Sequence, residues 1–586
     1  MSTNRELARL FQQTAAALEL LGENRFKVNA NTRVARLLKD LTQDLGEVVQ
    51  EGPETAVRRL TQLDGVGKGI AERIVEFVET GAMAEHTKLL ERIPAGLFEV
   101  LDIPGLGPKA VKLMWEELGI TSVDELKARL DSPELLALPR MGKKSIENIR
   151  KAIEFSEKSQ DRIPLGVARP IALELLAELR ALPGVQQADH AGSLRRGRET
   201  IGDLDFLVAC EDPSAVREHF VTRPAVTQVL AKGDTKSSVR LEVAGVVLQA
   251  DLRIVDRSAY GAALMYFTGS KEHNVRLREV AIKKNRRLNE YGLFEGKEER
   301  PQDSGTQPLA AATEEGIYRD LGLPFIPPEL REDRGELDGA PPRLIELADL
   351  RAELHAHTQA SDGRQTIEEL ARTALDHGFH TIAVTDHSQS AVIANGLRPD
   401  RLRRHIEAVR EADRRIDGIK ILAGSEVDIL TDGRLDYEDD LLAELDLVVA
   451  SPHMGLRQEP KAATERLLAA IRHPLVHIIG HPTGRIINKR EGLSPDMEAL
   501  FAAAVEHDTA LELNANWQRL DLRDHHLRAA LNHGVKIAID TDAHDAPHFD
   551  FVIYGILTAR RAGLEPESCI NTWPAHRLHE WLRSKR

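Results

Sequence analysis

Two short segments of the chain place carboxylates where they could hold metal ions. Asp203 and Asp205 stand two residues apart in a predicted strand, so both point to one face while their apolar neighbours point to the other. Asp251 lies on the polar face of a second apolar strand, over residues 246–254. If these strands are neighbours in one sheet, three oxygen ligands form a two-metal centre for phosphoryl transfer, and Mg²⁺ suits them. The alternative is an exposed acidic edge strand.

A turn rich in glycine and arginine precedes the first of these strands. It begins at Gly192 and Ser193 and continues through Arg195, Arg196 and Arg198. Glycines expose backbone N–H groups and arginines add charge, so the turn suits an anion such as a phosphate. An acidic edge strand would leave this turn unexplained, and the turn therefore favours the phosphoryl-transfer interpretation.

The C-terminal part of the chain alternates predicted strands with helices from about residue 350. Apolar segments such as 381–385 and 447–450 indicate a parallel sheet or barrel, whose strand ends carry the chemistry. Nine potential metal ligands stand at successive strand ends: His355, His357, Asp362, His387, Glu426, His453, His481, Asp542 and His544. One such histidine would more often be a satisfied core residue, but nine together predict a metal cluster, with Zn²⁺, Mn²⁺ and Fe²⁺ all open. Arg485 and Lys489 are either phosphate ligands or surface residues.

The first 155 or so residues read as helices joined by three glycine turns. Each turn precedes an amphipathic helix, for example one with Ile70, Ile74 and Phe77 on one face. Such a turn points backbone N–H groups outward at a helix N-terminus and can grip a phosphate without reading bases. The predicted DNA contacts are Gly65, Gly67, Lys68, Gly105, Gly107, Lys109, Gly142 and Lys143, with Arg140 replacing the first glycine of the third turn. The pattern resembles the helix–hairpin–helix module of DNA repair enzymes; a plain helical repeat is the alternative.

Length and composition indicate a multidomain chain in a reducing compartment. The 586 residues carry a formal net charge of −15, so contacts with nucleic acid must come from local basic patches. About three to five domains are expected from the length. No apolar run is long enough to span a membrane, and the N-terminus has no signal-peptide block. Cys210 and Cys569 lie far apart, which favours a cytoplasmic location, and a monomer is expected.

Together, the motifs over about residues 1–325 resemble a family X DNA polymerase. The Gly-Ser-x-Arg-Arg-Gly turn, the Asp-x-Asp strand, the later aspartate, a Tyr-Phe-x-Gly-Ser turn and the glycine hairpins occur in that family's order. The resemblance implies that Asp203, Asp205 and Asp251 are catalytic and hold two Mg²⁺ or Mn²⁺ ions. It also implies a nucleotide site of Gly192, Ser193, Arg196, Gly202, Tyr266, Phe267, Gly269, Asn274 and Arg278, in which the aromatic pair lines the sugar pocket.

The C-terminal ligands resemble the polymerase-and-histidinol-phosphatase (PHP) family, a distorted seven-stranded βα barrel with three metals. All nine ligand positions of that family are filled in this chain. The resemblance implies one metal held by His355, His357, Glu426 and Asp542, a second by Asp362, His387 and His544, and a third by His453 and His481 with Glu426 bridging. Three divalent ions, Zn²⁺, Mn²⁺ or Fe²⁺, are therefore expected there.

The expected architecture is multidomain: α-helical helix-hairpin-helix N-terminal domains, an α+β nucleotidyltransferase palm with a thumb, and a distorted (β/α)7 PHP barrel. The predicted divisions are an N-terminal helical DNA-binding domain (1–82), a fingers-like hairpin domain (83–157), the palm (158–258), the thumb (259–323), a linker (324–348) and the barrel (349–586). Prolines and charges in the linker predict an extended, semi-rigid connection.

One position departs from the repair members of the family. Those members use a lysine after the first hairpin to form a Schiff base with a deoxyribose phosphate. The matching residue here is Arg73, and an arginine stays protonated and cannot serve as that nucleophile. Weak or no lyase activity by this route is therefore expected.

The resemblance predicts a template-directed DNA polymerase that fills short gaps during DNA repair, with a barrel that acts as a 3′→5′ exonuclease on DNA ends. Its partners would be gapped or primer-template DNA and deoxynucleoside triphosphates. No association with a membrane is expected. One rival is a template-independent nucleotidyltransferase fused to a small-molecule phosphatase. Another is a DNA-end scaffold with inactive sites. The hairpin repeats argue against the first rival, and the intact ligand sets argue against the second.

Overall fold

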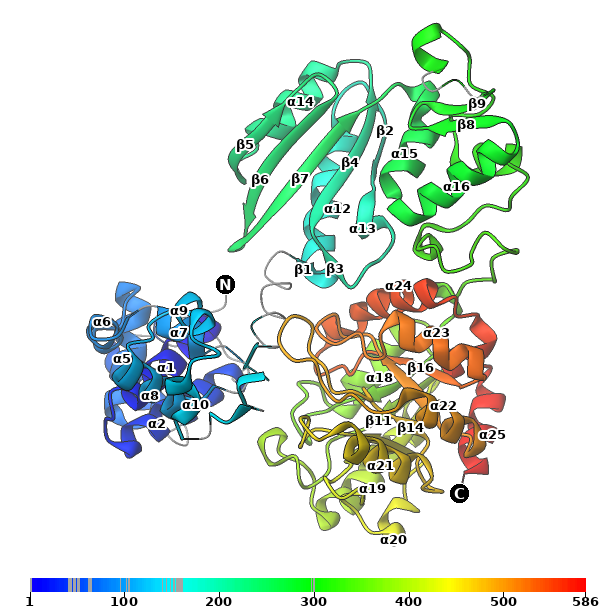
Figure 1. Ribbon diagram of the computed structural model, residues 1–586. Helices are drawn as coiled ribbons and strands as arrows, with labels where there is room; N and C mark the ends of the chain where they lie inside the picture. The colour runs from blue at the N-terminus through cyan, green and yellow to red at the C-terminus, as the bar shows by residue number, and fades with distance from the viewer. Residues whose placement is uncertain are drawn as a thin grey trace. The chain divides into compact units, whose positions relative to one another are not determined.

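The computed structural model describes residues 3–40, 45, 49, 53–61, 66–94, 96–101, 103, 106–139, 141–143, 145–147, 149–150, 153, 162–296, 298 and 301–585. The chain divides into two compact units, residues 1–160 and 161–586. The first unit is helical and the second contains the sheets (Figure 1).

The first unit is built around two apolar cores. Among its described residues, the helices are α1 (Thr3–Leu20), α2 (Arg25–Asp40), α4 (Pro53–Leu60), α5 (Lys68–Thr80), α6 (Ala84–Leu90), α7 (Gly96–Leu101), α8 (Pro108–Leu118), α9 (Val123–Ala128) and α10 (Pro133–Ala137). Helix α1 contributes to both cores, through Phe11 to one and Leu18 to the other. Helix α5 buries Ile70, Ile74 and Phe77, so the predicted amphipathic helix is confirmed.

The second unit begins with a five-stranded sheet, which we call the palm. Its strand order is β2 (Val185–His190), β4 (Asp203–Cys210), β7 (Val246–Ile254), β6 (Lys236–Val243) and β5 (Val226–Lys232), as Figure 1 shows. Strands β4 and β7 are parallel, and the other neighbouring pairs are antiparallel. Helices α12 (Leu165–Ala181) and α14 (Pro213–Thr222) pack on the sheet, and β1 (Ile163–Pro164) pairs with β3 (Thr200–Ile201). The apolar face of β4 thus lies in a core.

A smaller lobe, the thumb, follows the palm. It contains α15 (Tyr260–Thr268), α16 (Lys271–Lys283), the hairpin β8 (Arg286–Asn289) and β9 (Gly292–Glu295), and α17 (Glu314–Asp320). A buried ion-pair network ties the lobe to the palm. Glu314 accepts hydrogen bonds from Arg195 at 2.7 and 2.9 Å and from Arg331 at 2.6 Å. Burial alone would raise the pKa of Glu314, but Arg331 and Arg195 lower it to about 2.

We expect Glu314→Gln to reduce the free energy of unfolding of the second unit at pH 7 by about 3–5 kcal/mol, because two buried guanidinium groups lose their counter-charge. Because the folded-state pKa lies below the ordinary 4.5, the carboxylate contributes stability above that value and loses it as the pH falls towards 2. Urea unfolding at pH 7 and pH 3.5 should show a smaller difference between wild type and variant at the lower pH. Glu315→Gln, an exposed change on the same helix, is the control. Equal losses from the two variants would contradict the prediction.

Residues 324–348 are packed rather than extended, which corrects the predicted character of this segment. Ile326, Leu330 and Leu344 are buried in the thumb core, and Arg331 is 0% exposed. Charged residues of the segment pair with partners elsewhere in the chain, for example Glu332 with Arg196. The sequence pattern of prolines and charges does not reveal such long-range pairs.

The remaining residues form a parallel seven-stranded barrel, as predicted. Its strands, neighbours in chain order, are β10 (Ala352–Ala356), β11 (Thr381–Val384), β12 (Lys420–Asp428), β13 (Leu447–Ser451), β14 (Ile478–Ile479), β15 (Ala510–Asn514) and β16 (Ile537–Asp540). A bridge between Ala356 and Ala543 brings the first strand to the end of the last, so the barrel is nearly closed.

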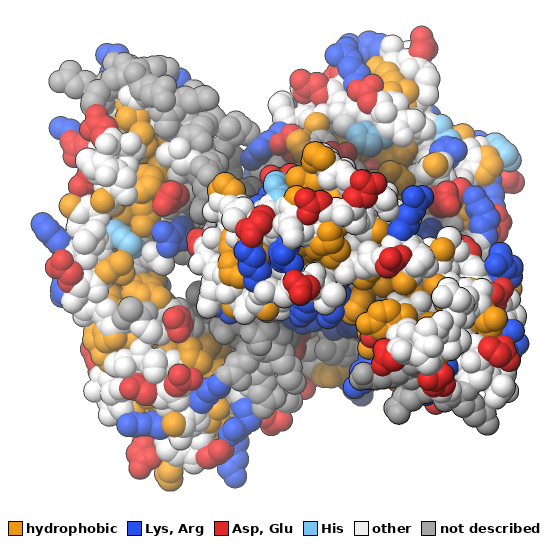
Figure 2. Space-filling model, turned by 90° about the horizontal axis from the view of Figure 1, so that it is seen from above, with side chains coloured by type: hydrophobic (Ala, Val, Ile, Leu, Met, Phe, Trp, Pro, Cys, Tyr) orange, Lys and Arg blue, Asp and Glu red, His pale blue; other side chains and the backbone are white. Residues whose placement is uncertain are grey.

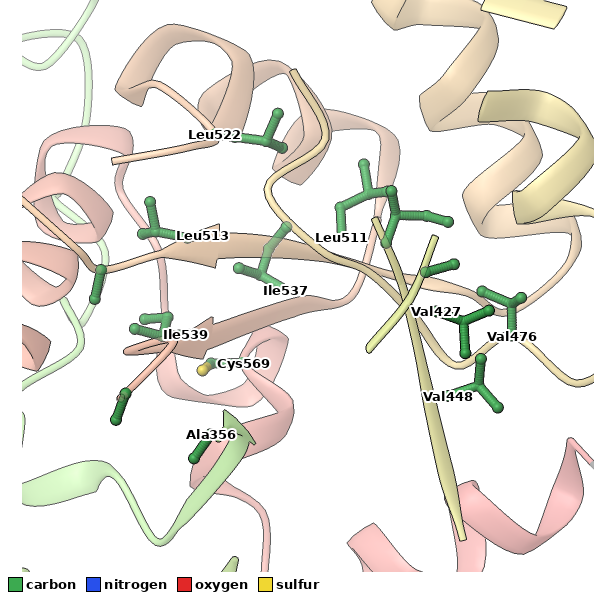
Figure 3. Close-up of a cluster of buried hydrophobic side chains, with 14 of the residues drawn as sticks. Ala356, Val427, Val448, Val476, Leu511, Leu513, Leu522, Ile537, Ile539 and Cys569 are labelled. Atoms are coloured by element: carbon green, nitrogen blue, oxygen red, sulfur yellow. The ribbon is translucent and has the colours of Figure 1, made fainter. Parts of the chain in front are cut away.

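Helices surround the barrel strands. They are α18 (Ile367–Asp376), α19 (Pro399–Arg415), α20 (Asp439–Leu442), α21 (Pro460–Ile471), α22 (Met497–Glu506), α23 (Asp524–His533), α24 (Val552–Ala562) and α25 (Ala575–Ser584). Alternate strand residues such as Val448, Leu511 and Ile539 pack in the core shared with these helices (Figure 3). The intervening residues point into the barrel, where Trp581 of α25 joins their apolar cluster. Among the described residues, no helix is long and apolar enough to cross a membrane.

Candidate polymerase and phosphoesterase sites

The two aspartate-bearing strands lie side by side in the palm. Strand β4 pairs with β7 in a register that sets Asp205 opposite Asp251. Ligand oxygens of Asp203, Asp205 and Asp251 all lie within 4.8 Å of one another. The convergence expected from the sequence is therefore present, and an isolated acidic edge strand is ruled out because β4 is central, between β2 and β7.

The crowded carboxylates fit divalent cations. Burial, followed by the charges of Asp203 and Asp251, raises the pKa of Asp205 to about 7. Lys236 lies 2.7 Å from the Asp251 carboxylate, but its charge and that of Arg253 do not offset the repulsion that raises the pKa of Asp205. A cation between the oxygens would relieve this repulsion, and a set of carboxylates alone suits the hard ions Mg²⁺ and Mn²⁺.

A cavity of about 670 Å³ opens beside the aspartates. It is lined by Arg162, Gly192, Ser193, Arg196, Arg198, Asp203, Asp205, Tyr266, Phe267, Thr268, Gly269, Lys271, Asn274 and Arg278. Every predicted nucleotide residue except Gly202 is in this lining. Gly202 lies against Arg162, whose Nη1 is 3.0 Å from the position that a Cβ would take. Sequence reasoning missed Arg162, Thr268 and Lys271; the position of Lys271 directly after the Gly-Ser turn was an available signal.

The glycine turn approaches the aspartates closely. Gly192 has φ of +60°, and a side chain there would collide with the Asp205 carboxylate, so only glycine fits. The Ser193 hydroxyl is buried and has no hydrogen-bond partner among the described residues. Arg196 donates through Nη1 to the carbonyl oxygen of Thr268 at 2.5 Å and through Nε to Glu332 at 3.0 Å. The turn therefore offers a free hydroxyl and a fixed guanidinium to an anion.

The other side of the cavity is formed by the turn between α15 and α16. Tyr266 and Phe267 pack edge to face with ring centroids 5.1 Å apart, and Arg253 covers the Phe267 ring at 4.0 Å. Asn274 donates to the carbonyl oxygen of Tyr266 at 2.7 Å, and Arg278 donates to that of Asn274 at 3.2 Å. These bonds fix an aromatic wall that can pack against a sugar.

The nine predicted barrel ligands gather at one end of the strands. Three sets each bring ligand atoms within 4.8 Å of one another: His357 with Asp362, His387 and His544; His355 with His357 and Asp542; and His387 with Glu426 and His453. His481 joins through Nε2, 2.9 Å from Glu426 Oε1. Glu426 is thus in contact with histidines from several sets, as a bridging ligand requires.

The side chains of the barrel cluster are chemically suited to binding metal ions. Buried atoms without a hydrogen-bond partner among the described residues include His355 Nε2, His357 Nδ1 and Glu426 Oε2. Burial, and then the neighbouring His544 and His387, lowers the pKa of His357 to about 4, which keeps the imidazole in its neutral, ligating form. Mixed imidazole and carboxylate donors suit Zn²⁺, Mn²⁺ or Fe²⁺.

Supporting groups around the cluster were missed by sequence reasoning. Glu512 lies 2.6 Å from His355 Nδ1, and Asn514 donates to Asp542 at 3.1 Å. Asp386 lies 2.7 Å from His405 and accepts from the Thr358 hydroxyl at 2.6 Å. These groups orient ligands and their neighbours. The spacing of Glu512 and Asn514, two residues apart, was an available but weak signal.

Arg485 and Lys489, the two basic residues noted in the sequence, have different environments in the structure. Arg485 is 1% exposed and pairs with Glu199 of the palm at 2.6 Å, so it is neither a surface residue nor free for phosphate. Lys489 is exposed. The arginine that does lie at the cluster is Arg519, whose Nε is 3.7 Å from Asp542 Oδ2.

The hairpin residues occupy exposed helix starts in the first unit. Gly67 and Gly107 precede α5 and α8, and neither cap carries a side-chain hydrogen bond. Gly67, Lys68, Gly107, Lys109, Gly142 and Lys143 are all exposed. Gly65, Gly105 and Arg140 lie outside the described residues. On the face drawn in Figure 2, basic and acidic side chains are interspersed.

Arg73 is engaged in fixed contacts. Its Nη1 is 2.5 Å from Glu85 and 3.1 Å from the Asn31 side chain, and its Nε donates to the carbonyl oxygen of Gly69 at 3.1 Å. The guanidinium also lies 5.2 Å from the centroid of the Phe11 ring. Arg73 therefore has a structural role, because it connects α5 to α2 and α6.

Family models match four stretches of the chain. A helix-hairpin-helix domain matches residues 2–83, and a SAM-like helix-hairpin-helix tandem matches residues 98–154. The DNA polymerase beta thumb matches residues 263–332, and the PHP domain matches residues 353–516. Their order agrees with the architecture expected from the sequence.

Curated relatives cover the whole chain or one of its parts. The chain is 37% identical to the DNA polymerase/3′-5′ exonuclease PolX of Bacillus subtilis over 569 residues, 97% of each chain. It is 26% identical to DNA polymerase lambda of Rattus norvegicus over 299 residues, 48% of this chain and 49% of the relative. It is 31% identical to a probable phosphatase of Thermoanaerobacter sp. over 248 residues, 40% of this chain and 94% of the relative. By its near full-length match, the chain belongs to the family X DNA polymerases that carry a C-terminal PHP domain.

Proposed function

We propose that the protein is a template-directed DNA polymerase that fills short gaps during DNA repair, and that its barrel is a metal-dependent 3′→5′ exonuclease acting on DNA ends. The observation that carries the proposal is the convergence of Asp203, Asp205 and Asp251 beside a cavity lined by a glycine-arginine turn. The full-length similarity to a polymerase with exonuclease activity supports it.

In the polymerase site, Asp203, Asp205 and Asp251 would hold two Mg²⁺ or Mn²⁺ ions. When bound, these ions would supply charge neutralisation at the triphosphate and acidity at the primer 3′-hydroxyl, and Asp251 would be the ligand next to that hydroxyl. Ser193, Arg196 and the Gly192 N–H bind the triphosphate. Tyr266, Phe267 and Gly269 line the sugar pocket and disfavour a ribose 2′-hydroxyl, while Asn274 and Arg278 contact the incoming base and the template. Catalysis then consists mostly of positioning and charge compensation.

In the barrel, the nine ligands would hold three divalent ions, Zn²⁺, Mn²⁺ or Fe²⁺, with Glu426 bridging. When bound, these ions supply the Lewis acidity that phosphoester hydrolysis needs. Arg519, beside Asp542, adds positive charge for the phosphate. Abasic-site endonuclease and 3′-phosphatase activities are consistent with the same chemistry.

DNA is held through the hairpin turns by its phosphate backbone, and deoxynucleoside triphosphates are the small substrates. The proposed divisions of the chain are those predicted from the sequence, except that residues 324–344 pack with the thumb and Ile345 joins the barrel core. A monomer working in the cytoplasm remains the expectation for the state and location of the protein.

A gapped duplex tests the proposal. Single-nucleotide incorporation should follow the template base in a short gap, require Mg²⁺ or Mn²⁺, and be faster there than on a single strand. Incorporation without regard to the template would favour the template-independent rival. If the barrel hydrolyses histidinol phosphate but not DNA ends, the same rival is favoured, because its C-terminal part is a small-molecule phosphatase. If the protein neither extends primers nor hydrolyses either substrate, the inactive DNA-end scaffold is favoured.

Deoxyribose phosphate lyase activity is expected to be absent or weak, because Arg73 is protonated and held by Glu85 and Asn31. Sodium borohydride trapping with an incised abasic site should give no covalent protein–DNA adduct. An adduct that disappears when a lysine in residues 1–82 is changed to alanine would contradict this expectation. A homologous lyase-proficient polymerase serves as the positive control for trapping.

A further inference from the structure

The nucleotide-binding turn of the palm touches the barrel directly. Gly197, at the end of the turn, has φ of +63°, and a Cβ there would be 3.2 Å from Leu557 Cβ on barrel helix α24. Arg561, four residues further along that helix, donates through Nη1 to the backbone carbonyl oxygen of Arg196 at 2.7 Å. The turn that carries a predicted triphosphate ligand is therefore supported from behind by the other catalytic domain.

Arg561 also shares a carboxylate with Arg196. Glu332 Oε1 accepts from Arg561 Nη1 at 2.9 Å and from Arg196 Nε at 3.0 Å, and Glu332 Oε2 accepts from Arg198 at 3.3 Å. The side chains of Arg561, Arg196 and Glu332 are only 4%, 12% and 9% exposed. Solvent therefore screens these contacts little.

The far side of the Arg561 guanidinium is fixed within the barrel. Its Nε and Nη2 donate to Asp524 Oδ2 at 3.1 and 2.9 Å, and Asp524 also pairs with Arg334 at 3.2 Å. Arg561 is thus held at both ends, with Asp524 on the barrel side and the Arg196–Glu332 pair on the palm side. The planar guanidinium group can hold the Arg196 turn in a fixed position, because it cannot rotate without breaking several charged hydrogen bonds.

We propose that Arg561 of the barrel is a positioning residue for nucleotide binding in the palm; the proposal rests on the proposed role of Arg196. Without Arg561, the Glu332 carboxylate would keep its charge but lose one of its three arginines. It would then draw the Arg196 guanidinium away from an incoming triphosphate, and the Arg196 carbonyl would lose its anchor. Nucleotide binding should weaken while the aspartates and the barrel ligands stay in place.

The test is single-nucleotide gap filling by the full-length chain at varied deoxynucleoside triphosphate concentration. Arg561→Met should raise the apparent KM for the nucleotide about tenfold, with kcat within about twofold of wild type. The thermal unfolding midpoint should fall, because Asp524 and Glu332 each lose a buried counter-charge. The exonuclease rate on a 3′ end, measured below that midpoint, should stay near wild type, which establishes that the barrel is folded. Arg561→Lys, which keeps the charge but not the fork, should give an intermediate rise.

Arg560→Met is the matched control. Arg560 lies next to Arg561 on α24 and pairs with Glu329 at 2.7 Å, and its hydrogen bonds among the described residues go to Glu329 and the carbonyl oxygen of Ile345, not to Arg196 or Glu332. It should leave the KM unchanged. An equal rise from both variants, or no rise in Arg561→Met and Arg561→Lys, would overturn the proposal.

Arg196→Met separates this proposal from the proposed function. If Arg196→Met leaves the KM unchanged, the assignment of Arg196 to the triphosphate is wrong, and the positioning role fails with it. If Arg196→Met raises the KM but Arg561→Met does not, only the positioning role fails. The double variant should have the KM of Arg196→Met alone, because Arg561 acts through Arg196; additive effects would contradict this route.

Discussion

Asp205→Asn is expected to reduce primer extension on a gapped duplex by at least about 10³-fold while 3′ trimming continues at the wild-type rate. Asp205 lies between the other two members of its cluster, opposite Asp251 in the strand register and two residues from Asp203. An amide keeps the shape of the side chain but removes the negative charge that a divalent ion requires. Steady-state incorporation and exonuclease rates, measured on the same preparation, check both halves of the prediction.

Asp234→Asn is the control for this change. Asp234 is a fully exposed carboxylate of the palm that pairs with Arg217 outside the cavity, so its replacement should leave extension unchanged. If the extension rate of Asp205→Asn stays within tenfold of the wild-type rate, this aspartate does not hold a catalytic ion. Loss of trimming together with extension would instead indicate that the variant is misfolded or that the two sites are not independent.

Asp362→Asn is expected to produce the converse result: 3′→5′ exonuclease activity falls by at least about 10²-fold and gap filling is unchanged. Asp362 Oδ1 lies 3.6 Å from His387 Nε2 and 3.4 Å from His544 Nε2, and its side chain is 34% exposed. The partial exposure makes this a milder change for the fold than one at a fully buried ligand. Elemental analysis of the purified protein should show a loss of bound metal.

The matched control is Asp550→Asn, an exposed barrel residue that lies 3.7 Å from His377, away from the ligand cluster. It should retain both the metal content and the nuclease rate. If Asp362→Asn loses metal but keeps trimming DNA, the metal that it binds is structural. If it keeps the full metal content and full trimming, the second set of ligands has been assigned wrongly.

Patterns along the chain predicted the elements and most residues of both sites. Alternation in β4 and β7 predicted the shared acidic face, because side chains two residues apart in a strand must point the same way. The barrel followed from the strand-then-helix rhythm, and the parallel order placed every ligand-bearing strand end at one rim. These features depend on local geometry, which a sequence specifies directly.

The missed features are those that depend on pairs distant in the chain. Prolines and charges predicted an extended connection over 324–348, yet the side chains of Arg331 and Glu332 are 0% and 9% exposed and pair with Glu314, Arg196 and Arg561. Arg485 was predicted to be a phosphate ligand or a surface residue. In the structure it is buried and pairs with Glu199, which lies 286 positions away in the chain. No local pattern reports which charge meets which, because such pairs are set by how domains pack.

The near-closure of the barrel has a consequence for a chain that is still being synthesised. His357 and His544 belong to one ligand set, and the bridge from Ala356 to Ala543 joins the first strand region to the last. No ribosome-bound intermediate that stops short of β16 contains both, so the nuclease centre cannot assemble on it, whereas the palm strands emerge much earlier. A nascent chain would thus complete the ligand set of the nuclease centre only after its last barrel strand has emerged.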